Sequence, residues 1–192
     1  MAIDRERIAS AVREILQSIG EDPNRHGLLD TPQRVADALG ELYGGVGVDP
    51  VGILTEPGSC ADVDTHDTVI VRGIRFRSMC EHHLLPFHGI AHVAYVPEKT
   101  VVGLGRIARL VDIIASRPQV QERLGQEIGD ALTRGVAARG TLVVLEATHE
   151  CVAARGSRQE SATAVTVSSA GELADPAARA ATLALIGASG DR

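Results

Sequence analysis

The sequence contains no apolar run of the roughly 18 to 20 residues that a membrane-spanning helix needs. It also does not begin as a secretory signal does, because the opening segment MAIDRERIAS carries too many charges. We therefore expect a cytoplasmic protein that does not act at a membrane. Its 192 residues, 44% of them hydrophobic, are enough for one main globular domain with a sizeable core.

Cysteine and positive charge are also scarce. The three cysteines, Cys60, Cys80 and Cys151, are an odd and sparse set, which argues against a disulfide framework. For Cys60 we favour a role as a small buried hydrophobic residue. A formal net charge of −6 argues against general binding to nucleic acid. Because Lys99 is the only lysine, an anionic substrate would have to be held by arginines.

The first part of the chain is predicted to form a helical arm. Apolar residues at helical spacing predict one helix over residues 4–19, and Thr31 and Pro32 are typical of the start of a second helix. Residues 46–67 are rich in Gly, Pro and Asp and show no clear period, so we expect a long connection there. The predicted organisation is an arm over 1–45, a connecting segment over 46–67 and a main domain over 68–192.

The main domain is predicted to contain two pairs of strands that flank two helices. Segments rich in β-branched residues predict the strands, and apolar stripes at helical spacing predict the helices between them. The order ββααββ indicates an α+β fold with an antiparallel sheet and helices on one face. A short last helix is expected after Pro176. The predicted strands cover 68–76, 89–97, 141–151 and 161–169, and the two helices cover 105–117 and the stretch between Pro118 and Gly140.

A dense group of potential metal ligands, CEHH, lies between the first two predicted strands. Cys80 and His83 are three residues apart, a spacing that brings both side chains to one side of a tight turn. In the segment THEC at the end of the third strand, His149 and Cys151 face the same way if the strand continues. Two thiols and at least one imidazole can thus converge from two sheet ends and bind a metal such as zinc.

The spacing leaves two kinds of metal site open. A closed structural site would use four protein ligands, with His82 or His149 as the fourth. A catalytic site would use Cys80, His83 and Cys151 alone and leave a position for water, whose pKa the metal lowers towards about 7. His82 and His149 would then be free to act as general acids or bases near that water.

Arginines near helix starts suggest an anionic ligand. Arg106 and Arg109 lie three residues apart near the start of the helix that follows GLG, and Arg34 lies in the first turn of its own helix. Cations at these places oppose the helix dipole, whereas the backbone N–H groups there attract anions. Together with Arg155 and Arg158, which follow THEC, these side chains indicate a polyphosphate.

These motifs resemble those of the GTP cyclohydrolase I family. CEHH, GLGRIARLVD, the block RPQVQERL over residues 117–124, and THEC followed by Arg155 and Gly156 occur in the family's order and at similar separations. TPQR at 31–34 extends the resemblance over most of the chain. The combination of CEHH with RPQVQERL is highly specific.

The resemblance implies a tunnelling fold that assembles into a ring-shaped homodecamer with active sites at subunit interfaces. It also implies a catalytic zinc on Cys80, His83 and Cys151, and hydrolysis of GTP at C8 with loss of formate. The implied product is 7,8-dihydroneopterin triphosphate, for pterin, folate or specialised deazapurine synthesis. The implied roles are proton transfer for His82 and His149, guanine recognition for Glu122, substrate contacts for Gln121 and Arg106, and triphosphate binding for Arg34, Arg109 and Arg155.

Two segments depart from the family's pattern. Gly105 and Arg106 stand where the family usually has Ser and Lys, so a hydroxyl near the ribose and phosphates is missing. Ala164, Val165 and Val167 stand where a threonine-rich run is expected. Two alternatives therefore remain. One is a divergent enzyme that stops at a ring-opened formamidopyrimidine or acts on another purine nucleotide. The other is a non-catalytic member that binds nucleotide or holds a structural zinc.

Overall fold

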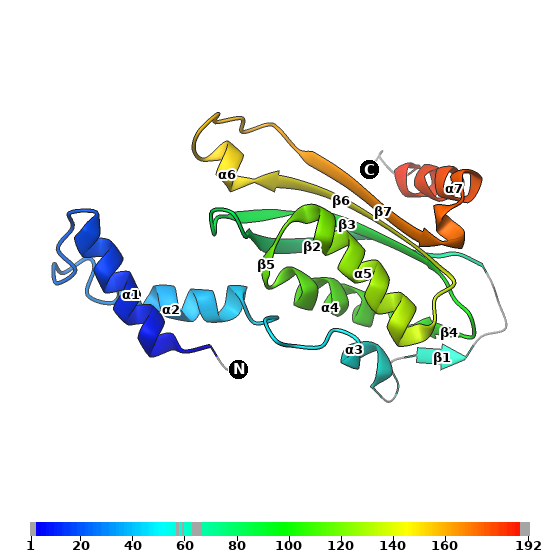
Figure 1. Cartoon of the computed structure of the whole chain (residues 1–192), viewed down its shortest axis with the longest axis horizontal. Coiled ribbons are helices and arrows are strands. Elements are labelled where there is room, and N and C mark those ends of the chain that lie inside the picture. The colour runs from blue at the N-terminus through cyan, green and yellow to red at the C-terminus, as the bar shows by residue number, and fades with distance from the viewer. Residues whose placement is uncertain (1–2, 57, 59, 63–66, 189–192) are drawn as a thin grey trace.

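The N-terminal helices form a pair that projects from one end of the molecule (Figure 1). Helix α1 spans Arg5–Ser18 and helix α2 spans Thr31–Leu42, close to the predicted limits. The Asp4 carboxylate caps α1 by accepting a hydrogen bond from the Arg7 amide at 3.0 Å. The computed structural model describes residues 3–56, 58, 60–62 and 67–188, so residues 1–2, 57, 59, 63–66 and 189–192 of the predicted arm, connection and main domain lie outside the described residues.

The connecting segment contains short elements that its composition does not predict. Helix α3 spans Gly52–Thr55, and strand β1, Cys60–Asp62, pairs antiparallel with strand β4, Thr100–Val102. These elements are too short to show a period in the sequence. The Cys60 thiol lies 3.2 Å from the Leu54 carbonyl oxygen and is half-buried against the main core, as expected for a packing residue.

A five-stranded sheet forms the centre of the main domain (Figure 1). Its long strands β2 (Val69–Cys80), β3 (Pro86–Val96), β6 (Gly140–His149) and β7 (Ala164–Gly171) are antiparallel neighbours in that order. The two-residue strand β5, Pro118–Gln119, runs parallel to the end of β2. The predicted α+β fold with an antiparallel ββααββ arrangement is confirmed.

Strand β3 begins three residues before its predicted start and β7 begins three residues after it, while the C-terminal ends of β2 and β6 differ in ways that concern the site. Strand β2 continues to Cys80, which therefore ends a strand instead of lying in the turn. The polar Ser78 is buried there because its hydroxyl donates to the Ala115 carbonyl at 2.7 Å, a contact that the sequence pattern hides. Strand β6 stops at His149, and helix α6, Glu150–Ala153, follows at once. The predicted strand through Cys151 is wrong at its last two residues.

Two helices cover one face of the sheet, and a third packs on the other. Helices α4 (Leu104–Ala115) and α5 (Gln121–Val136) pack on the face that carries Val93 and Tyr95. The alternate residues Ala94 and Val96 face the opposite way, where helix α7 (Pro176–Gly187) and the short turn η1 (Glu172–Ala174) pack. None of the helices within the described ranges combines the length and the apolar character needed to cross a membrane.

Candidate active site

Three potential metal ligands meet at one end of the sheet. Cys80 ends β2, His83 lies in the turn that follows, and Cys151 lies in α6. One donor atom from each residue lies within 4.8 Å of the others. A turn of helix, and not a continuing strand, brings Cys151 to the other two. The turn that carries His83 is closed by a hydrogen bond from the Leu84 amide to the Cys80 carbonyl oxygen at 2.8 Å.

This donor set fits a zinc ion. Zinc binds thiolate sulfur at about 2.3 Å and imidazole nitrogen at about 2.0 Å, which places tetrahedral ligand atoms about 3.3 to 3.8 Å apart. Burial raises the pKa of the Cys151 thiol, and the adjacent Cys80 raises it further. A cation between the two sulfur atoms would favour the thiolate forms and so lower the pKa of these thiols. Within the described part of the chain, no fourth His, Cys, Asp or Glu joins the group.

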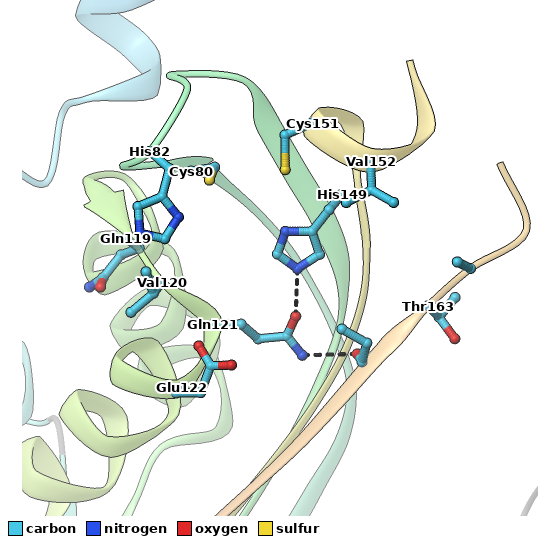
Figure 2. A pocket seen from close by; sticks show the side chains of 12 residues that line it. Cys80, His82, Gln119, Val120, Gln121, Glu122, His149, Cys151, Val152 and Thr163 are labelled. Carbon is cyan, nitrogen blue, oxygen red and sulfur yellow. Dashed lines mark hydrogen bonds between the residues drawn. The ribbon is translucent and has the colours of Figure 1, made fainter. Parts of the chain in front are cut away.

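A pocket of about 350 Å³ lies beside the three ligands (Figure 2). Its walls come from the end of β2, the segment that enters α5, the end of β6 and the chain before β7. His82 and His149 lie on opposite sides of this pocket. The predicted site residues that line it are Cys80, His82, Gln121, Glu122, His149 and Cys151.

His149 is held in a defined orientation and tautomer. Its ring stacks on the buried Phe87, with centroids 4.6 Å apart and planes 1° apart, and its Nε2 lies 2.8 Å from Gln121 Oε1. The Gln121 amide nitrogen donates to the carbonyl oxygens of Leu145 at 3.0 Å and Ala164 at 2.9 Å. Because those carbonyls only accept, the amide oxygen must face His149. His149 therefore carries its hydrogen on Nε2 and leaves Nδ1 as an acceptor.

The environment of His149 also favours its neutral form. Burial lowers the pKa of His149, and the nearby Glu122 opposes this with a smaller effect in the other direction. Gln121 is only 2% exposed, and its amide nitrogen also reaches the Thr166 hydroxyl at 3.2 Å. The side-chain amide of Gln121 is thus engaged with the protein, while the residue also lines the pocket, and its contact with substrate stays a prediction.

The predicted anion-binding arginines do not gather at this pocket within one chain. Arg155 lies beside the metal group, with Nη1 3.4 Å from His83 Nε2. Arg34 pairs with Asp30 at 3.1 Å on the arm, and Arg106 pairs with Glu56. Arg109 is exposed on α4, a helix that begins after β4, at the end of the sheet away from α6 (Figure 1).

Several residues around the site were not singled out from the sequence. Phe87 supports His149, and Arg123 forms an ion pair with Glu81, whose pKa is lowered mainly by its hydrogen bond to Arg123. Gln119 is buried behind this pair. The available signal was the block RPQVQERL itself, which contains both Gln119 and Arg123. Gln119 lies in β5, before α5 begins, so helical spacing would not have predicted their contact. Nothing local in the sequence connects that block with Glu81.

The fold and the site together define a class of protein. The chain is an α+β protein with a Cys-His-Cys group at the end of an antiparallel sheet, next to a pocket with two histidines and a carboxylate. Such a concentration of metal donors and titratable side chains is typical of a metal-dependent enzyme. The comparison with known families identifies which one. The family model for GTP cyclohydrolase I matches residues 8–187, and the chain belongs to this family.

Individual relatives agree with this family. A protein named GTP cyclohydrolase 1 from Leifsonia xyli subsp. xyli is 57% identical over 184 residues, which are 96% of this chain and 96% of that protein. Proteins of the same name from Bifidobacterium longum and Mycobacteroides abscessus are 50% and 48% identical, covering 95% of this chain and 91% and 90% of theirs. Among solved structures, the apo form of archaeosine synthase QueF-Like aligns with a TM-score of 0.47 and 16% identity, over 56% of this chain and 97% of that chain. The chain is an enzyme of the predicted family.

Proposed function

We propose that this enzyme is a zinc-dependent GTP cyclohydrolase I. It hydrolyses GTP at C8 of guanine, releases formate and forms 7,8-dihydroneopterin triphosphate in the cytoplasm, for pterin or folate synthesis or a specialised deazapurine pathway. The observation that carries this proposal is the Cys-His-Cys group beside a pocket with two histidines and a carboxylate. The family membership and the names of the relatives support the substrate.

Cys80, His83 and Cys151 would hold the zinc. The three-donor group supports a catalytic ion over a closed structural one, because a closed site uses four protein ligands. Zinc bound there supplies a Lewis acid that lowers the pKa of a coordinated water towards about 7.

The two histidines serve the proton transfers. Release of formate requires both bonds from C8 to the ring nitrogens to break, and each departing nitrogen needs a proton. His149 accepts a proton at Nδ1, because Gln121 keeps the other ring hydrogen on Nε2. His82, across the pocket, donates to the ring nitrogen on its side (Figure 2). The stacking of His149 on Phe87 keeps its ring in one plane for both directions of transfer.

Glu122 binds the guanine edge. Its carboxylate lines the pocket from the first turn of α5 and accepts hydrogen bonds from the ring N–H and the amino group. A pocket of about 350 Å³ is within the usual range for a small-molecule site, which supports a single base as its occupant.

The triphosphate is bound by arginines from more than one copy of the chain. Arg155 serves the pocket of its own chain, whereas Arg34, Arg106 and Arg109 are contributed by neighbouring copies, with Arg34 carried by the arm of residues 1–45. Two exposed sheet edges support such an assembly: β7 pairs only with β6 among the described strands, and β5 covers β2 only at Met79 and Cys80. The family resemblance suggests a homodecamer.

Metal-loaded protein incubated with GTP, with and without a chelator, tests the proposal through formate release and the mass of the product. Chelator-sensitive formate release with a dihydroneopterin triphosphate product is the expected result. Ring opening without formation of the pterin would instead support the alternative in which the reaction stops at a ring-opened intermediate, which was considered because of Gly105. Untouched GTP in a protein that holds stoichiometric zinc would refute the substrate assignment.

A further inference from the structure

The turn that carries His83 is held from outside the metal group. His83 is exposed, so few contacts of its own side chain fix its position. The position of its backbone is therefore set by the turn of residues 81–84, and Glu81 is the first residue of that turn. The Glu81 amide donates to the Gln119 carbonyl oxygen at 3.1 Å, and the Glu81 carboxylate pairs with the Arg123 guanidinium. Both attachments of Glu81 therefore lead to the segment that enters α5.

Arg123 is itself held by several partners. Its Nε donates to Gln119 Oε1 at 3.0 Å, and its Nη2 lies 3.3 Å from the Pro118 carbonyl oxygen. Glu127, one turn later on α5, lies 3.6 Å from Arg123 Nε. Gln119 is 1% exposed, and its amide nitrogen donates to the Ile114 carbonyl and the Glu127 carboxylate at 3.3 and 3.0 Å. The guanidinium thus bridges a buried, fully engaged glutamine and the Glu81 carboxylate.

We propose that Arg123 is a positioning residue for the metal group: through Glu81 it sets the place of the turn that presents His83. This inference rests on the proposed zinc site. Arg123 does not line the pocket, so it acts on the ligand only through Glu81. The same short segment contributes to the pocket wall Gln121, which orients His149, and Glu122, which binds the base in the proposed function. The Arg123–Glu81 pair therefore keeps the metal group aligned with these two residues.

Arginine suits this task better than lysine. Its fork donates from Nε to Gln119 and from Nη2 to Glu81 at the same time, whereas an ammonium group has no fixed second direction. Partners that orient a metal ligand from behind typically affect metal affinity by about 10- to 100-fold when removed. The main effect is expected on the metal, because Glu81 and Arg123 are both partly exposed. Arg123→Gln also takes a donor from the buried Gln119 Oε1, a loss of stability that Glu81→Gln does not cause.

The test is a zinc titration of the full chain in competition with a chromophoric chelator. Arg123→Gln and Glu81→Gln should each weaken zinc binding by about 10-fold or more. The double variant should bind no more weakly than the weaker single variant, because both changes remove one contact. Arg77→Gln is the matched control: Arg77 also pairs with a glutamate, Glu41, and lies on β2 before Cys80. Its zinc affinity should stay within twofold of the unaltered protein.

A second readout reports the geometry directly. With Co²⁺ in place of zinc, the ligand-field absorption should change in Arg123→Gln and Glu81→Gln and stay unchanged in Arg77→Gln. Single variants that bind zinc as the unaltered protein does, or a double variant whose loss is the product of the two, would overturn the inference and leave the proposed function intact. If the unaltered protein binds no zinc, the proposed zinc site itself fails. Glu81→Gln lies in an exposed turn, so it keeps the test available if Arg123→Gln folds poorly.

Discussion

The contact between Gln121 and His149 predicts a variant whose loss of activity exceeds what its loss of stability explains. Gln121→Met keeps the approximate length and volume of the side chain and removes every hydrogen bond that the amide makes. The amide has four partners: His149 Nε2, the carbonyl oxygens of Leu145 and Ala164, and the Thr166 hydroxyl. His149 is then free to rotate and to place its hydrogen on either nitrogen.

The size of both effects follows from these partners. A buried polar group left without a partner costs about 1–3 kcal/mol. The Thr166 hydroxyl, which accepts from the amide, the half-buried imidazole and the carbonyl of the exposed Ala164 can all reach water instead. The buried Leu145 carbonyl remains without this donor, so we expect a loss of about 1–3 kcal/mol in the free energy of unfolding. A correctly placed general acid or base contributes about 10²- to 10⁴-fold to rate, so we expect kcat to fall by about 10²-fold.

Formate release at saturating GTP measures kcat, and urea unfolding measures stability. Gln126→Met is the matched control, because Gln126 is on the same helix but is exposed. It should leave both quantities close to those of the unaltered protein. A Gln121→Met protein that is destabilised yet turns over GTP at the normal rate would refute the role of Gln121 in orienting His149.

Three further predictions concern metal, backbone space and pH. A chelator should abolish formate release and leave the far-UV circular dichroism spectrum nearly unchanged. The reason is that the Cys-His-Cys group lies at the end of the sheet and the core does not depend on it. Parallel loss of both signals would instead indicate a structural zinc. Gly89→Ala should lower the free energy of unfolding by about 3 kcal/mol, because the new Cβ would lie 1.9 Å from the Glu146 carbonyl oxygen. The Cβ of Gly105→Ala would meet open space, so this variant should keep the stability of the unaltered protein. Equal midpoints of urea unfolding for the two variants would contradict this prediction. Burial lowers the pKa of His92, Arg72 lowers it further, and Glu146 opposes them. Below about pH 6.5 the unfolded chain therefore binds a proton more readily than the folded chain, and the free energy of unfolding decreases as the pH is lowered. His92→Gln should make this decrease smaller in urea unfolding between pH 7.5 and 5.5, and an unchanged decrease would refute the assignment.

Local spacing predicted the parts of the site that depend on one segment. Cys80 and His83 are close in sequence, so any tight turn after Cys80 brings them together. Cys151 was also identified, but for the wrong reason: the strand was expected to continue, and the chain instead turns into α6. A four-residue helix has too short a sequence pattern to be recognised against a continuing strand.

Contacts between distant segments could not be predicted from spacing. The pair of Glu81 and Arg123, and the carbonyl acceptors around Gln121, depend on the register of strands that are far apart in the sequence. For the arginines, the sequence indicated a kind of ligand but not a common location. Arg34, Arg106 and Arg109 have the sequence surroundings of anion ligands, yet a single chain separates them from the pocket. Helix-end chemistry predicts an anion but does not predict where in the fold the other residues of its site lie.

The origin of the pocket walls has a consequence for how the enzyme matures. The walls come from four chain segments, residues 80–82, 119–122, 149–152 and 162–164, and whole strands and helices separate the first three of them. Contacts between such distant segments form late, because the loops between them must be closed first. A chain that has built α4, α5 and only the β2–β3 hairpin has not yet brought Cys151, which follows β6, to the other two residues of the proposed zinc site. If the chain binds zinc as proposed, zinc uptake by a refolding sample therefore reports the molecules whose pocket is complete and does not report the partly folded ones.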